Sequence, residues 1–300
     1  MRILKKSFVS RARLFISALF AFLLAGSVVQ SEAQIYTITA QNSSSSVQVS
    51  LSGGSSGLSD WQVGGVNQLY QQWFYYSLDS GTVNSIDTIA SPASIVNHTT
   101  GNAPFVSAVY TNSGISVTAK FGLNNSATLS DTITVLNPAT SGLTHVFHFY
   151  QYSDFDLAGV SGGQTAQFYN NGSGSYYEVM QGGGAASLDT LLSASNPSEV
   201  QAGIYDGNQF GLGNGNSAPF LNNTLAAGPG DAVFAYEWDL TLAAGSSFQI
   251  SEFQTVTVQT VTVPEPSSVA LISSGMLALA LLNRRRRRNV LMPLFEGVMR

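Results

Sequence analysis

Two pairs of acidic residues have a spacing that could do chemistry on an extended chain. Asp154 and Asp156 close an aromatic stretch just before a glycine-rich segment, and Glu237 and Asp239 flank Trp238 in the motif YEWDL. Alternate residues of a β-strand point to the same face, so each pair would present two carboxylates together. Paired carboxylates can bind Ca²⁺, or can act as acid and base on a sugar.

Each pair also has an interpretation that needs no ligand. Asp154 and Asp156 could form a turn at the end of a strand, because Asp favours turns. Glu237 and Asp239 fit a half-buried strand whose polar face meets water, with Trp238 on the other side, although carboxylates beside an aromatic ring also resemble a sugar subsite. These five residues are therefore candidates for a metal or glycan site. We assign no catalytic residue and expect no cofactor other than Ca²⁺ at these carboxylates.

The elements that must position these residues are β-strands. Six segments alternate at period two and are rich in Val, Ile, Thr, Phe and Tyr, which predicts strands; they are residues 46–51, 115–123, 127–137, 143–152, 231–242 and 247–261. Residues 186–195 form the single helical candidate, and residues 41–46 and 51–60 are typical of flexible loops. We therefore predict an all-β fold with a single large antiparallel β-sandwich over residues 34–263.

Charge and cysteine content exclude several classes of function. Residues 34–263 hold Lys120 as their one Lys or Arg against 14 Asp and Glu, a formal charge of −13. Such a surface repels phosphate backbones, which excludes nucleic acid as a partner. The chain has no cysteine, so thiol chemistry and thiolate metal sites are excluded as well.

The first 33 residues have the order of a secretory signal peptide. A basic start is followed by an apolar run over residues 14–29 and by small residues at Ser31 and Ala33. This order predicts cleavage by signal peptidase after Ala33 and export across the inner membrane, with an uncleaved anchor as the alternative.

The C-terminal region combines a short apolar segment with a basic cluster. Residues 269–282 carry no charge, and five arginines follow them, namely Arg284, Arg285, Arg286, Arg287 and Arg288. We predict a short transmembrane helix over about 267–283, with the arginines as a membrane stop on the cytoplasmic side. Residues 289–300 would then be a cytoplasmic tail extension.

The order of a VPEPSS motif, a short apolar span and an arginine cluster resembles the PEP-CTERM sorting signal of exported bacterial proteins, here over residues 264–288. The resemblance implies that Pro264, Glu265 and Pro266 are the sorting and processing motif, read by an exosortase-like enzyme after a transient hold in the inner membrane. It also implies a Gram-negative bacterium with an exopolysaccharide-producing envelope, and a destination at the cell surface or in the extracellular matrix. Family tails usually stop after the basic cluster, whereas this chain continues to Arg300.

These patterns favour a non-enzymatic exported surface or matrix protein that associates with extracellular polysaccharide. One alternative is a secreted carbohydrate-active enzyme that uses two of Asp154, Asp156, Glu178, Glu237 and Asp239. The other is a calcium-stabilised adhesin.

Overall fold

The computed structural model describes residues 34–125, 127–170, 175–183, 186–192, 196–215, 221–258 and 268–291. The predicted signal peptide, the motif Pro264-Glu265-Pro266 and residues 292–300 lie outside these ranges. The described residues fall into two units, one that ends at Val258 and one that holds the helix α2 (Ser268–Leu291).

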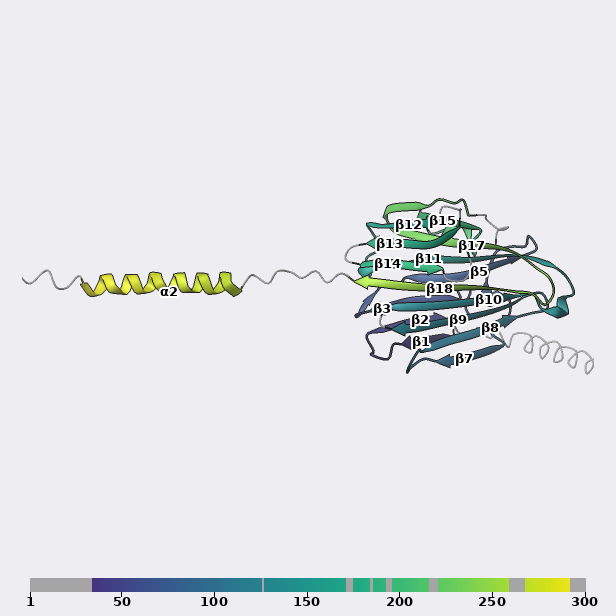
Figure 1. The fold of residues 1–300 in the computed structure, drawn as a ribbon, viewed down its shortest axis with the longest axis horizontal. Helices are drawn as coiled ribbons and strands as arrows, with labels where there is room; N and C mark the ends of the chain where they lie inside the picture. Colours follow the sequence, from purple (N-terminus) through teal and green to yellow (C-terminus); the bar gives the residue numbers. More distant parts are fainter. Residues whose placement is uncertain are drawn as a thin grey trace, which may run out of the picture. The chain divides into compact units, whose positions relative to one another are not determined.

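The first unit contains two antiparallel sheets of nine strands each (Figure 1). The first sheet has the strand order β1 (Ile35–Thr39), β2 (Ser45–Ser50), β3 (Gly57–Val63), β5 (Gln71–Leu78), β11 (His145–Asp154), β17 (Ala232–Leu242) and β15 (Glu199–Ile204). Two short strands, β4 (Val66–Asn67) and β6 (Asn84–Ser85), pair with β3 and β5. The centre of this sheet is therefore built from strands that are far apart in the sequence.

The second sheet has the order β16 (Ala226–Gly230), β12 (Gln164–Asn170), β13 (Tyr176–Gly183), β14 (Ala186–Leu192), β18 (Ser247–Val258), β10 (Thr128–Leu136), β9 (Ser116–Asn125), β8 (Phe105–Thr111) and β7 (Ser94–His98). Short 3₁₀ helices occur in the connections, namely η1 (Ile86–Thr88), η2 (Ala139–Ser141), η3 (Leu157–Gly159) and η4 (Gln209–Gly211).

The main hydrophobic core lies between the two sheets and draws side chains from both. Phe74 of the first sheet packs against Phe121 of the second with ring centroids 5.5 Å apart, and Phe168 of the second packs against Phe234 of the first at 6.1 Å. Alternation along each strand sends every second side chain into this layer, which is the arrangement of a sandwich. The predicted all-β class and antiparallel sandwich are confirmed.

Two local expectations fail for the same reason, which is pairing with neighbouring strands. The helix expected over residues 186–195 is wrong in its described part, because Ala186–Leu192 form β14, hydrogen-bonded between β13 and β18. The loop expected over residues 51–60 ends early, because β3 begins at Gly57. Long-range pairing overrides weak local preference in both segments.

A second, smaller core covers the outward face of the first sheet. Tyr150 and Tyr152 of β11 pack there with Ala235 of β17, while Leu212 and Leu221 come from the connection between β15 and β16. The central strands β11 and β17 are therefore buried on both faces over most of their length.

The second unit holds the helix that was predicted near the C-terminus. Helix α2 (Ser268–Leu291) covers the apolar segment and continues through the arginine cluster. None of the helices in the described ranges has both the length and the apolar character needed to cross a membrane.

Candidate functional site

The outward face of β11 places four side chains in a row that leads away from the main core. His148, Tyr150, Tyr152 and Asp154 alternate with core residues of the same strand, so all four point to the side opposite the second sheet. The most exposed of the four is His148, at 9%. Both acidic pairs from the sequence meet this row, because Asp239 lies opposite His148 at one end and Asp154 forms the other end.

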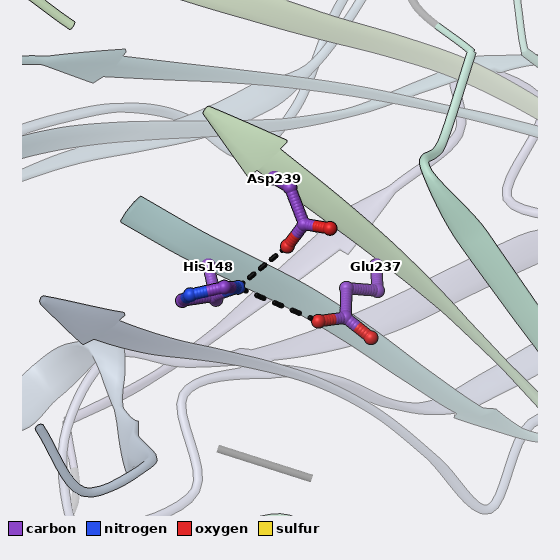
Figure 2. Close-up of side chains that lie close together, drawn as sticks. All are labelled: His148, Glu237 and Asp239. Carbon is purple, nitrogen blue, oxygen red and sulfur yellow. Dashed lines mark hydrogen bonds and ion pairs between the residues drawn. The ribbon is translucent and has the colours of Figure 1, made fainter. Parts of the chain in front are cut away.

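The pairing of β11 with β17 assembles a cluster of His148, Glu237 and Asp239. The register sets Asp239 opposite His148 and Glu237 opposite Tyr150. Nδ1 of His148 lies 2.5 Å from Oδ1 of Asp239 and 3.5 Å from Oε1 of Glu237. Figure 2 shows one edge of the imidazole turned toward both carboxylates. Because the carboxylate oxygen of Asp239 accepts hydrogen bonds, we assign the Nδ1–H of the imidazole as the donor in this contact.

Glu237 is the buried acid of the cluster. Its side chain has no exposed surface, whereas that of Asp239 is 35% exposed. Burial raises the pKa of Glu237 to about 8; the negative charges of Asp239 and Glu199 add to the rise, and a hydrogen bond from the backbone N–H of Leu221 (2.8 Å) opposes it. Glu237 is therefore largely protonated at neutral pH and acts as a neutral acid beside the carboxyl group of Asp239.

This arrangement can hold a proton or a metal ion. One nitrogen of His148 and one oxygen from each of Glu237 and Asp239 lie within 4.8 Å of one another. A mixed nitrogen and oxygen donor set suits Zn²⁺ or another first-row transition metal. Without a metal, the same groups form an acid–base pair in which the neutral Glu237 is enclosed and Asp239 meets solvent.

The structure brings Asp154 and Asp156 together with a third carboxylate, that of Asp231. Asp154 ends β11, Asp156 precedes η3, and Asp231 lies between β16 and β17. One oxygen from each lies within 4.8 Å of the others. Burial raises the pKa of Asp154 to about 7, and the charges of Asp231 and Asp156 add to the rise. An all-oxygen group of this kind suits a hard cation such as Ca²⁺.

Two other residues named from the sequence lie away from these clusters. Trp238 is 1% exposed and points into the main core, where its ring contacts Phe149 (6.3 Å) and Tyr236 (5.6 Å). Its indole is therefore closed to a sugar ring. Glu178 lies on β13 of the second sheet, where Asp189 is its charged neighbour.

His148 and Asp231 were not among the candidate site residues predicted from the sequence, although both belong to these clusters. The strand alternation already set His148 on the face of Tyr150, but the pairing with Asp239, 91 residues later, depends on the register of β11 and β17. The water-facing interpretation of Glu237 is also overturned, because Leu221 and its neighbours from the connection after β15 cover that face. The local sequence does not indicate that the connection after β15 covers this face of the sheet.

Solved structures share the fold at low sequence identity. A bacterial glucoamylase complexed with acarbose has a TM-score of 0.56 at 15% identity, over 81% of this chain and 34% of the glucoamylase chain. A galactose 1-epimerase from Lactobacillus acidophilus NCFM has a TM-score of 0.48 at 10% identity, over 76% of this chain and 100% of that chain. This chain thus spans about a third of the glucoamylase, and at 15% identity the likeness establishes the fold alone. No curated protein sequence matches the chain.

The sheet topology and the likeness to the glucoamylase define the class of the first unit as a large, two-sheet antiparallel β-sandwich. The C-terminal region is more specific, because the sequence profile of the PEP-CTERM protein-sorting motif matches residues 262–287. The chain therefore carries a PEP-CTERM motif, as the resemblance in its sequence indicated. The motif marks an exported, sorted protein that is processed by an exosortase-like enzyme.

Proposed function

We propose that this chain is a surface or extracellular-matrix protein of a Gram-negative bacterium, and that its sandwich associates with extracellular polysaccharide without catalysis. The sorting motif at residues 262–287 is the observation that carries the proposal. The surface agrees with it, because residues 34–263 rely on uncharged polar side chains and a formal charge of −13, a combination suited to a hydrated matrix of neutral sugars.

The two ends of the chain have separate tasks in this proposal. Signal peptidase removes residues 1–33 after export. The short apolar segment at residues 269–282 then serves as a transient hold in the inner membrane, and Arg284–Arg288 keep the residues after it on the cytoplasmic side. The exosortase-like enzyme cuts near Pro264-Glu265-Pro266, which releases the sandwich toward the outer surface.

Intact-mass measurement of the protein from cells and from medium tests this route. We expect a mature form that begins at Gln34 and ends near Pro266. Replacing Pro264, Glu265 and Pro266 by Ala should leave the C-terminal segment attached and the protein in the membrane fraction. Pro293→Ala, beyond the matched motif, is the control and should be processed normally. A mature surface form that still contains Arg288 would contradict the sorting route.

The polysaccharide partner needs its own test. The mature protein is incubated with immobilised exopolysaccharide from the producing strain, and the bound fraction is measured. We expect retention that free polysaccharide competes away. No retention would remove the polysaccharide part of the proposal and leave the sorting route standing.

Acid–base chemistry on a saccharide is a second candidate, favoured by the contrast between Glu237 and Asp239. A neutral acid with a pKa of about 8 beside an exposed aspartate has the division of roles that glycoside hydrolysis uses. The complete burial of Glu237 weighs against direct contact with a substrate. Release of reducing ends by the wild type and a drop of at least about 100-fold in Glu237→Gln would establish it. A wild type that releases none would exclude it.

A further inference from the structure

We infer that Asp154, Asp156 and Asp231 form a binding site for Ca²⁺ at one end of the first sheet. This site is separate from the sorting motif and from the cluster around His148, and it goes beyond the proposed function.

The position of the three residues is set by paired strands and by backbone hydrogen bonds. Asp154 is the last residue of β11, and its carbonyl accepts a hydrogen bond from the N–H of Tyr70 (3.0 Å). The carbonyl of Asp231 accepts one from the N–H of Tyr205 (2.8 Å), and that of Asp156 accepts one from Gly159 (2.8 Å). The backbone therefore holds three carboxylates together without using their side-chain oxygens.

Electrostatics make the group unfavourable without a cation. Asp154 is 2% exposed, and burial raises the pKa of each of the three carboxyl groups. For Asp154 and Asp156 the charges of neighbouring carboxylates raise the pKa further. No ion pair found in the described ranges involves any of the three. The one lysine of the sandwich, Lys120, lies on β9 of the other sheet over the ring of Phe105. The described residues of the sandwich therefore supply no Lys or Arg to this end of β11, so an external cation would relieve the repulsion.

Buried polar groups point to a ligand at the same place. Gln71 is 3% exposed and lies opposite Asp154 in the β5–β11 register, with its side chain beside the hydroxyl of Tyr152. The hydroxyl of Tyr152, two residues before Asp154 on the same face, is fully buried and has no close partner in the described structure other than the side chain of Gln71. Oδ1 of Asp231 is also buried and accepts no hydrogen bond from the described residues. Burial raises the pKa of Tyr152, and the charges of Asp154 and Asp231 raise it further, which puts its hydroxyl near both carboxylates.

The chemistry of these donors selects Ca²⁺. Carboxylate and hydroxyl oxygens, with the amide oxygen of Gln71 after a flip of the side chain, make a set of oxygen ligands alone. Hard cations prefer oxygen, whereas Zn²⁺ prefers nitrogen and sulfur. Ca²⁺ accepts irregular geometry more readily than Mg²⁺, and exported modules bind it at about 0.1–1 mM. Bound Ca²⁺ would tie the end of β11 and the turn to η3 to the start of β17.

The test is calorimetric unfolding of the exported protein after removal of divalent cations. Adding CaCl₂ to about ten times the Kd should raise the Tm by about 3–6 °C, and MgCl₂ should raise it less. The double variant Asp156→Asn and Asp231→Asn should lose the calcium shift. Without Ca²⁺ it should be at least as stable as the wild type, because like-charge repulsion is removed, and this shows that it folds.

A matched control comes from the second sheet. Asp189→Asn alters an acidic neighbour pair, Glu178 and Asp189, that lacks a third carboxylate, and the calcium shift should persist in it. A wild type with no shift would overturn the site, and so would an equal shift in the double variant. A shift that vanishes in Glu237→Gln but survives in the double variant would assign the ion to the His148 cluster and equally overturn the inference.

Discussion

Asp131 and Glu252 lie directly opposite each other on β10 and β18, with both side chains inside the sandwich. Asp131 accepts a hydrogen bond from Nε2 of Gln72 at 2.6 Å, and Glu252 accepts one from Nε2 of Gln151 at 2.7 Å. Gln72 and Gln151 belong to the first sheet and the two acids to the second. A polar bridge therefore crosses the largely hydrophobic core between the two sheets.

This acid pair should make the sandwich more stable at mildly acidic pH. Burial raises the pKa of Glu252 from 4.5 to about 7, and it raises that of Asp131 well above its usual range, with the charge of Glu252 adding to the effect. The folded protein holds protons that the unfolded chain releases above about pH 4.5. The stabilisation is complete below that pH and is lost as the pH rises through about 7.

Urea denaturation at pH 5 and pH 8 measures the effect. For Glu252 we expect the free energy of unfolding to fall by on the order of 3 kcal/mol across this range. Glu252→Gln keeps an acceptor for Gln151 and cannot ionise, so its pH dependence should be smaller than that of the wild type. Asp206→Asn, in a loop, should follow the wild type. Identical slopes for Glu252→Gln and the wild type would refute this account.

Gln72 is predicted to be the most sensitive member of the polar bridge. It donates to Asp131, and its Oε1 accepts from Nε2 of Gln254 at 2.5 Å. Oγ of Ser153 also donates to this Oε1 at 3.4 Å, so Gln72→Ala would remove a hydrogen bond from three buried partners and create a cavity. We expect a loss of about 2–4 kcal/mol in the free energy of unfolding, measured in urea. Gln167→Ala, at a half-buried position of β12, should lose less than about 1 kcal/mol.

Trp238 should matter for stability and not for sugar binding. Its ring lies between Phe149 and Tyr236 in the core, so Trp238→Ala should lower the free energy of unfolding by about 3–5 kcal/mol. Trp238→Phe keeps most of the packing and should leave the affinity for polysaccharide unchanged. A Trp238→Phe variant that folds normally but no longer binds would show that the indole meets the ligand.

At Gly57 the backbones of β3 and β5 lie too close together for a side chain. Its φ is +154°, and a Cβ atom there would lie 2.0 Å from the carbonyl oxygen of Gln72. Gly57→Ala should therefore force the two backbones apart and cost about 3 kcal/mol or more. The control is Gly162→Ala, where a Cβ meets nothing within 4 Å. Thermal unfolding of both variants tests the contrast, and equal Tm values would contradict it.

The strands of the sandwich were predictable because their residues alternate along the chain. Residues 231–242 and 247–261 were expected as strands and appear as β17 and β18, with boundaries within a few residues where the structure is described. The C-terminal sorting motif was predictable because its three parts are contiguous in the sequence.

The clusters were only half predictable, because each needs strands that are distant in sequence. Alternation pairs Glu237 with Asp239, but only the register of β11 and β17 adds His148. Asp154 and Asp156 are neighbours in the sequence, whereas Asp231 joins them through the start of β17. The burial of Asp131 and Glu252 could not be predicted from the local sequence, because a single acid in an alternating strand ordinarily faces water.

The position of Lys120 has a consequence for cleavage by proteases that cut after Lys or Arg. It is the one Lys or Arg between Gln34 and Val258, and its backbone lies inside β9, hydrogen-bonded to β8 on one side and β10 on the other. A protease that cuts after Lys or Arg has one peptide bond to cleave in this range, the bond after Lys120. That bond becomes accessible only when β9 separates from both β8 and β10. The folded sandwich should therefore resist cleavage by proteases of trypsin-like specificity.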